Sequence, residues 1–189
     1  MGKIKLSNLL KSLAVLVATL LCSVNINAQV PGDVFESGGL KYKVWSTTHN
    51  TVHIIPPLGS YYDLADVVIP EKVNYKGTSF TVTEIEDYAF TNSTITSVII
   101  PGSVKEIGDE AFSDCHNLAD VTFNEGLEKI GTEAFMNTSL SEISVPESLT
   151  IVEDYVFHDT PWYENLPYGE IYLGNLFYSY KADFHTTEY

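Results

Sequence analysis

A thiol and an imidazole stand side by side at Cys115 and His116, the two side chains that a cysteine nucleophile and its general base require. Adjacent residues rarely point their side chains at each other, so we interpret Cys115 as a structural thiol rather than a nucleophile. If Cys22 leaves with the N-terminal segment, Cys115 is the only cysteine of the mature chain and cannot form an internal disulfide. It could still link two chains in an oxidising compartment.

Other catalytic and metal-binding patterns are missing from the sequence. It contains no HExxH or comparable histidine spacing, no glycine-rich phosphate loop, no GxSxG elbow and no CxxC. Carboxylates are so frequent that some pair will lie close by chance, which is weak evidence for a glycosidase. A hydrolase would need a deep pocket with a perturbed carboxylate or histidine. We therefore expect a protein that is not an enzyme, with no catalytic residue, no metal site and no cofactor. The histidines are His49, His53, His116, His158 and His185.

The position three residues before each repeated phenylalanine, called the polar slot below, holds a small polar residue. Such residues are good helix N-caps, whose side chains accept from the free backbone N–H groups of a short helical turn. The alternative is a calcium-binding ladder of carboxylates, because stacked strands lie about 4.8 Å apart. A threonine interrupts that ladder, whereas caps explain every position, so we predict N-caps. The slot holds Asp87, Asp109, Thr132 and Asp154.

A sequence repeat positions these side chains. Four segments align, and their phenylalanines are 22, 23 and 22 residues apart. This period is typical of a solenoid, in which stacked units bury a core that no single unit could bury. The alternation Leu118-x-x-Val121-x-Phe123 predicts a strand in each unit. The phenylalanines are Phe90, Phe112, Phe135 and Phe157, and the matching strand patterns are Leu64/Val67/Ile69, Ile95/Val98/Ile100 and Leu140/Ile143/Val145.

The repeated segments IGDEAFSDCHNL, from Ile107, and IGTEAF, from Ile130, resemble the BspA-like leucine-rich repeats of bacterial surface and secreted proteins. The resemblance extends from about Leu64 through Lys181. It implies a repeat solenoid that is mainly β, a short leucine-rich-repeat stack with β-hairpin caps at both ends. It also implies protein–protein contact or adhesion to host or neighbouring-cell surfaces.

Both ends of the stack need a cover, since open strand edges promote association between chains. At the front, the segments from Leu40 and Thr51 can pair. Within the longer interval between the first two strand patterns, Lys76-Gly77 can turn a hairpin. At the back, two strand patterns flank Gly174-Asn175, another two-residue hairpin signal. We predict one leucine-rich repeat domain over 29–189, divided into an N-terminal cap at 29–63, repeats at 64–159 and a C-terminal cap at 160–189.

The N-terminus, residues 1–28, is typical of a secretory signal peptide. Lysines precede an apolar run from Leu13 to Cys22, and cleavage is expected after Ala28. The run is too short to span a bilayer, and the leucines before Cys22 fit a lipoprotein signal poorly. We expect export, with the mature chain secreted or at the cell surface and not inserted into the membrane.

The charge of the mature chain restricts its partners. After residue 28 there are seven lysines against 25 acidic residues, a net −18, and no arginine. Such a surface repels nucleic acid and anionic membranes but admits basic or neutral partners. The sequence does not determine the oligomeric state.

Two surfaces are candidates for ligand binding. Residues that flank the buried position of each strand should point outward in two columns, enough to contact a peptide or a small protein patch. The aromatic tail could instead be a carbohydrate platform, although we favour a role in covering the last unit. The leading hypothesis is a non-catalytic recognition module that binds a protein or cell-surface component, and the alternative is a carbohydrate-binding accessory protein. The strand-face candidates are Asp66, Val68, Ser97, Ile99, Asp120, Thr122, Glu142 and Ser144, and the sugar-site candidates are Trp162, Tyr163 and Tyr172.

Overall fold

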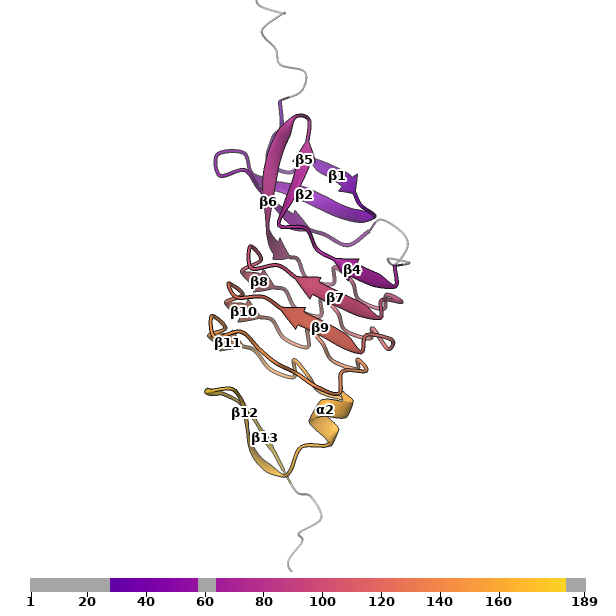
Figure 1. The fold of residues 1–189 in the computed structure, drawn as a ribbon, viewed down its shortest axis with the longest axis vertical. Helices are drawn as coiled ribbons and strands as arrows, with labels where there is room; N and C mark the ends of the chain where they lie inside the picture. The colour runs from indigo at the N-terminus through magenta and orange to yellow at the C-terminus, as the bar shows by residue number, and fades with distance from the viewer. Residues whose placement is uncertain (1–27, 58–63, 183–189) are drawn as a thin grey trace, which may run out of the picture.

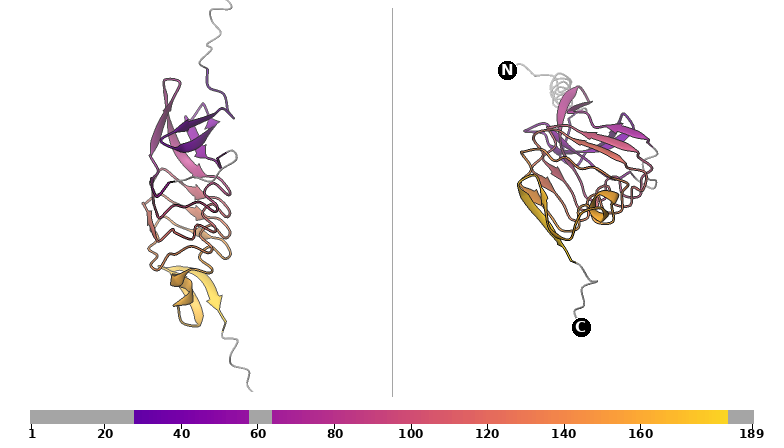
Figure 2. Two further views of the ribbon diagram at one scale, coloured as in Figure 1. Left: turned by 90° about the vertical axis from the view of Figure 1, so that its right-hand side faces the viewer. Right: turned by 60° about the horizontal axis from the view of Figure 1, so that its bottom comes forward.

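The structure, a computed structural model, describes residues 28–57 and 64–182. The signal-peptide prediction, Cys22 and His185 lie outside these residues. The fold is mainly β, as predicted, and its units pile up along the long axis of an elongated molecule (Figures 1 and 2). The described strands form sheets of eight, three and two strands.

At the N-terminal end, β1 (Val34–Ser37), β2 (Leu40–Ser46) and β3 (Thr51–Ile54) form an antiparallel meander. β5 (Lys72–Tyr75) and β6 (Thr78–Ile85) form a hairpin around Lys76-Gly77, whose φ angles are 47° and 82°. Positive φ at both central residues matches the twist of paired strands. Both pairings predicted for this end are confirmed.

Parallel strands then follow on two sides of the stack. β6 pairs in turn with β8 (Glu106–Ile107), which pairs with β10 (Lys129–Ile130), which pairs with β11 (Ile151–Val152). On the other side of the stack, β4 (Asp66–Val68), β7 (Ser97–Ile100) and β9 (Asp120–Phe123) form the three-stranded sheet. The chain winds around a core between these two sheets (Figure 2).

Four phenylalanine rings stack in one column through that core. Their centroids are 4.8, 5.0 and 5.6 Å apart, with interplanar angles of 4°, 7° and 19°. The spacing follows that of paired strands because each unit supplies one ring. All four side chains are at most 1% exposed, so the repeated phenylalanine is the core residue of every unit. The column consists of Phe90, Phe112, Phe135 and Phe157.

The fourth strand pattern, Leu140/Ile143/Val145, does not form a strand, although the same pattern does so in the preceding units. Ile143 and Val145 are only half-buried, whereas Val98 and Ile100 are at most 1% exposed. The next unit continues as the short helix α2 (Pro161–Glu164) instead of a strand, so this segment would have a neighbour on one side only. The expectation of a strand here is therefore wrong.

The polar slot before each phenylalanine joins one unit to the next. Asp87 Oδ1 accepts from the backbone N–H of Asp109 at 2.9 Å, and Asp109 Oδ1 accepts from that of Thr132 at 2.8 Å. The prediction of N-caps is wrong for these two residues, because the donor belongs to the following unit rather than to a helical turn of their own. Gly108 and Gly131 give the carboxylates room, since a Cβ at either would lie 2.4 Å from the aspartate oxygen.

The C-terminal end departs from the repeat. Thr160 caps α2, its Oγ1 accepting from the N–H of Tyr163 at 3.1 Å. β12 (Gly169–Leu173) and β13 (Leu176–Lys181) form the predicted hairpin, below β11 in Figure 1. Lys181 Nζ donates to the carbonyl oxygens of Tyr163 and Glu164 at 2.9 and 2.8 Å, which ties the hairpin to the C-terminal end of the helix.

Tyr178 completes the hydrogen bonding of the last unit. The N–H groups of Phe90, Phe112 and Phe135 each donate to a backbone carbonyl one unit further on, at 2.7 to 2.9 Å. In the described part of the chain no further repeat unit follows Phe157, and the Phe157 N–H donates to the Tyr178 hydroxyl at 2.8 Å instead. A side-chain oxygen thus takes the place of the carbonyl that a fifth unit would supply.

Candidate recognition surface

The three-stranded sheet presents the predicted columns of outward side chains. Its register aligns Asp66 with Ser97 and Ser97 with Asp120. The second column aligns Val68, Ile99 and Thr122. The residues between them, Val67 and Val98, are buried in the core.

The two columns differ in chemistry. Val68 and Ile99 are 67% and 40% exposed, so the second column carries apolar surface. In the first column, Asp66 Oδ1 accepts from the hydroxyls of Ser97 at 2.7 Å and Thr96 at 3.1 Å, which holds that carboxylate against the sheet. Asp120 is exposed and takes part in none of the ion pairs found within 28–57 and 64–182.

Glu142 and Ser144 lie one unit further on, in the segment that does not form a strand. Both are exposed, and Glu142, like Asp120, has no ion-pair partner among the described residues. A depression of about 320 Å³ lies between this segment and β9. Its lining comprises Ala119, Asp120, Val121, Ser141, Glu142, Ile143 and Ser144.

Two of the three sugar-site candidates lie together. Trp162 and Tyr172 line a second depression of about 310 Å³ between the last unit and the hairpin. Tyr163 is outside it: its ring is 5% exposed, contacts His158 at a centroid distance of 4.4 Å, and lies under Lys181 Nζ. Tyr163 is therefore part of the packing beneath the hairpin, not of an exposed platform.

The adjacent thiol and imidazole point apart. Cys115 is fully buried, and its Sγ donates to the carbonyl oxygen of Phe90 at 3.0 Å. Burial raises the pKa of this thiol and so disfavours the thiolate. Burial also keeps the Cys115 thiol away from the thiol of a second chain. His116 is exposed, with its Nδ1 3.2 Å from the carbonyl oxygen of Asn137. Within the described ranges, no three His, Cys, Asp or Glu residues are arranged to hold a metal ion.

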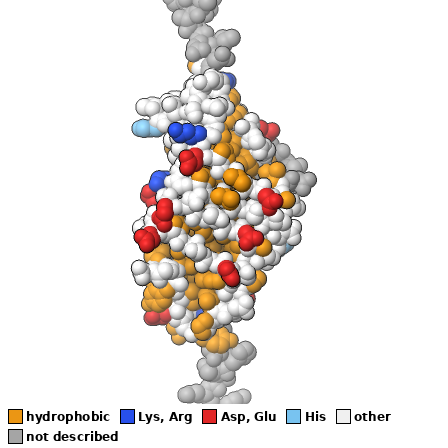
Figure 3. Space-filling view, in the orientation of Figure 1, with side chains coloured by type: hydrophobic (Ala, Val, Ile, Leu, Met, Phe, Trp, Pro, Cys, Tyr) orange, Lys and Arg blue, Asp and Glu red, His pale blue; other side chains and the backbone are white. Residues whose placement is uncertain are grey.

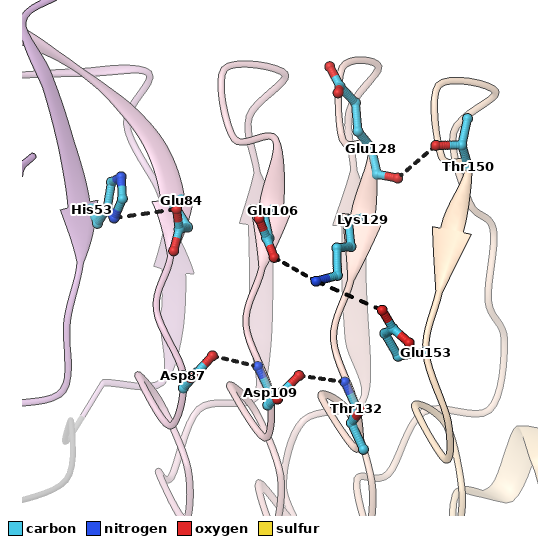
Figure 4. A network of polar contacts seen from close by, with 10 residues as sticks. All are labelled: His53, Glu84, Asp87, Glu106, Asp109, Glu128, Lys129, Thr132, Thr150 and Glu153. Carbon is cyan, nitrogen blue, oxygen red and sulfur yellow. Dashed lines mark hydrogen bonds and ion pairs between the residues drawn. The ribbon is translucent and has the colours of Figure 1, made fainter.

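The opposite sheet carries a polar cluster that the sequence analysis missed. The parallel register sets His53 beside Glu84 and Glu84 beside Glu106 (Figure 4). His53 is 3% exposed, stacks under Trp45 at 4.6 Å, and has its Nδ1 3.4 Å from carboxylate oxygens of Glu84 and Glu86 without hydrogen-bond geometry.

Charges in this cluster perturb its titration. Burial, with the charges of Glu106, Glu86 and Asp87, raises the pKa of Glu84 to about 7, and burial lowers the pKa of His53. Lys129 Nζ contacts Glu106 at 2.9 Å but not Glu84 (Figure 4). Neither Glu84 nor His53 lines either of the two depressions described above. The signal that could have found the cluster is the identical position of Glu84 and Glu106 in successive units.

Comparisons with known proteins agree with the geometry of the repeat. Residues 74–164 match the family described as BspA type leucine-rich repeat region, in six copies. The match begins ten residues after Leu64 and ends before the hairpin. No curated protein matches the chain. Within the described residues, no helix has the length and apolarity needed to cross a bilayer.

Solved structures of bacterial proteins share the fold. A leucine-rich repeat protein from Bacteroides capillosus is 28% identical, with a TM-score of 0.56 over 67% of this chain and 96% of its own. A leucine-rich cell surface protein from Faecalibacterium prausnitzii is 29% identical, with a TM-score of 0.51 over 67% of this chain and 33% of its own. The leucine-rich repeat protein of T. pallidum, 21% identical with a TM-score of 0.51 over 67% of each chain, shows the likeness of the fold alone. Residues 74–164 of the chain thus form a BspA type leucine-rich repeat region.

Proposed function

We propose that this protein is an exported recognition module that binds a protein partner, without catalysis, through the face of β4, β7 and β9. Leucine-rich repeat proteins of this family generally mediate protein–protein contact. In this proposal the signal peptide is removed after Ala28, and residues 29–189 form one capped solenoid domain. It is secreted or held at the cell surface, where it contributes to adhesion.

The observation that carries the proposal is the pair of unpartnered carboxylates, Asp120 and Glu142, on an exposed strand face. Apolar side chains accompany them, and Figure 3, which shows this face, has acidic and hydrophobic side chains in close proximity. Interfaces combine an apolar contact with charges that steer the partner. With a net charge of −18 for residues 29–189, the favoured partner is basic.

The test is capture of surface proteins from neighbouring cells with the purified protein and with the double variant Asp120→Lys/Glu142→Lys. We expect the double variant to lose at least tenfold in affinity for the captured partner, with an unchanged melting temperature. The matched control, Glu128→Lys/Glu153→Lys, makes the same charge change on the opposite sheet, where exposed ion pairs contribute little to stability. Equal affinity of the wild-type protein and the Asp120/Glu142 variant would refute this choice of face.

A carbohydrate-binding function is the second candidate, because Trp162 and Tyr172 line one depression. Exposed aromatic rings present the apolar surface on which sugar rings pack. A glycan array separates the candidates: sugar binding that disappears in a folded Trp162→Ala variant supports this function, and a blank array rejects it.

A further inference from the structure

The two depressions on the recognition surface lie next to each other. Both are lined by Ile143 and Ser144, so the 320 Å³ depression beside β9 adjoins the 310 Å³ depression beside the hairpin. They lie on the two sides of the segment that fails to form a strand. A ligand that crosses this segment contacts both.

The half beside β9 suits a cation. Asp120 and Glu142 line it, both exposed and both outside the ion pairs of the described residues. Two carboxylates at one depression repel each other, and a lysine or arginine side chain between them relieves that repulsion. Among the residues that the structure describes, no lysine or histidine lines this depression.

The half beside the hairpin suits a large apolar side chain. Val145, Leu166 and Leu173 lie beside the Trp162 ring in its lining, together with exposed polar atoms. The hydroxyl of Tyr172 already donates to Glu170 at 2.8 Å and is not available to donate to a ligand. A volume of about 310 Å³ is at the lower end of ligand pockets and fits one side chain better than a larger molecule.

We propose that the two depressions together bind an extended segment of a partner protein, with a lysine or arginine between Asp120 and Glu142 and an aromatic or large aliphatic side chain against Trp162. Side chains two residues apart in an extended segment point the same way and are separated by about 6.6 Å, so one short segment can present both side chains to the same face. This inference rests on the proposed function and specifies the chemistry of its partner.

The test titrates the isotope-labelled protein with capped peptides and follows amide and indole chemical shifts. The first peptide carries a lysine and a tryptophan two residues apart. One control replaces tryptophan with alanine, and the other replaces lysine with glutamate. We expect the first peptide to bind at least tenfold more tightly than either control, with shifts centred on Asp120, Glu142 and the Trp162 indole.

A blocking variant keeps the test independent of folding defects. Trp162 packs on Phe157, so its removal could unfold the end of the stack. Ser144→Trp instead adds a bulky side chain at an exposed residue shared by both depressions, and Ser79→Trp, at an exposed residue of β6, is its control. We expect Ser144→Trp to abolish peptide binding and Ser79→Trp to leave it unchanged.

Equal affinity for all three peptides, shifts away from both depressions, or no saturable shift at millimolar peptide would each overturn the inference. Glycan binding that is blocked by Ser144→Trp would overturn it as well. Capture of a partner that is lost in Asp120→Lys/Glu142→Lys but retained in Ser144→Trp would reject the two-part site while the proposed function stands. Capture retained in both variants would reject the proposed function too.

Discussion

The hydrogen bonds between units predict that Asp109 and Asp154, which occupy equivalent repeat positions, contribute differently to the stability of the protein. Asp109 accepts from the N–H of Thr132 in the next unit, whereas Asp154 occupies the same slot in the last unit and makes no side-chain hydrogen bond among the described residues. Asp109→Ala therefore removes a contact between units. Asp154→Ala removes the same atoms and the same charge without removing such a contact.

The expected cost follows from the geometry. A hydrogen bond to a charged group contributes about 1.5–3 kcal/mol, but Asp109 is exposed and water competes for its N–H partner, so we take about 1 kcal/mol. For a protein of this size that corresponds to a melting temperature lower by about 2–4 °C. Asp154→Ala should shift it by less than about 1 °C, as surface substitutions usually do.

Urea denaturation and thermal scans of both variants in the same buffer measure this difference. An Asp109→Asn variant, which keeps an acceptor oxygen at the same place, should fall between wild type and alanine. If Asp154→Ala destabilised the protein as much as Asp109→Ala, the slot would act within its own unit, and the hydrogen bonds between units would not be the reason for the aspartates.

Three further predictions concern other positions. Gly131→Ala should destabilise the protein by more than about 1 kcal/mol in urea denaturation, because the new Cβ would lie 2.8 Å from the Asp109 amide nitrogen as well as 2.4 Å from its carboxylate; an unchanged midpoint would contradict this. Tyr178→Phe should cost about 1–2 kcal/mol by leaving the Phe157 N–H without an acceptor, and a melting temperature equal to that of wild type would refute its capping role. The pKa of Glu84 in the folded state is about 7, above its ordinary value, so the folded state binds more protons than the unfolded state and stability should fall as pH rises from about 4.5 to 7. Glu84→Gln should be more stable than wild type at pH 8, and its stability should no longer fall over this pH range. An unchanged pH dependence in Glu84→Gln would refute the assignment to Glu84.

The parts of the fold that could be predicted from the sequence are those that local or strictly repeated patterns encode. The phenylalanine column follows from spacing alone, since equivalent positions of stacked units must coincide. The hairpins at Lys76-Gly77 and Gly174-Asn175 follow from turn chemistry, which two residues determine.

The remaining features depend on neighbours that a pattern does not reveal. The pattern Leu140/Ile143/Val145 predicts a strand, but the segment pairs with neither β9 nor the unit after it, which is a helix. The apposition of His53 and Glu84 depends on the register between β3 and β6, which are separated by β4 and β5 in the sequence. Tyr163 is of a residue type that often forms an exposed aromatic platform, but its contacts with Lys181 and His158 bury it beneath the hairpin.

The same feature that ends the stack also creates its candidate site. At the fifth position the chain replaces the repeat with α2 and a hairpin, and Tyr178 substitutes for the missing backbone carbonyl. Hydrogen bonding at the phenylalanine column is thereby completed. On the face of β4, β7 and β9 no side chain substitutes for a further strand in this way, and the two depressions lie there between β9 and the hairpin. Strand edges left open invite pairing with other chains, and here acidic side chains at one half and bulky aromatic side chains at the other limit which chain can approach. A continued repeat would place a strand over both depressions, so the site depends on the stack ending where it does.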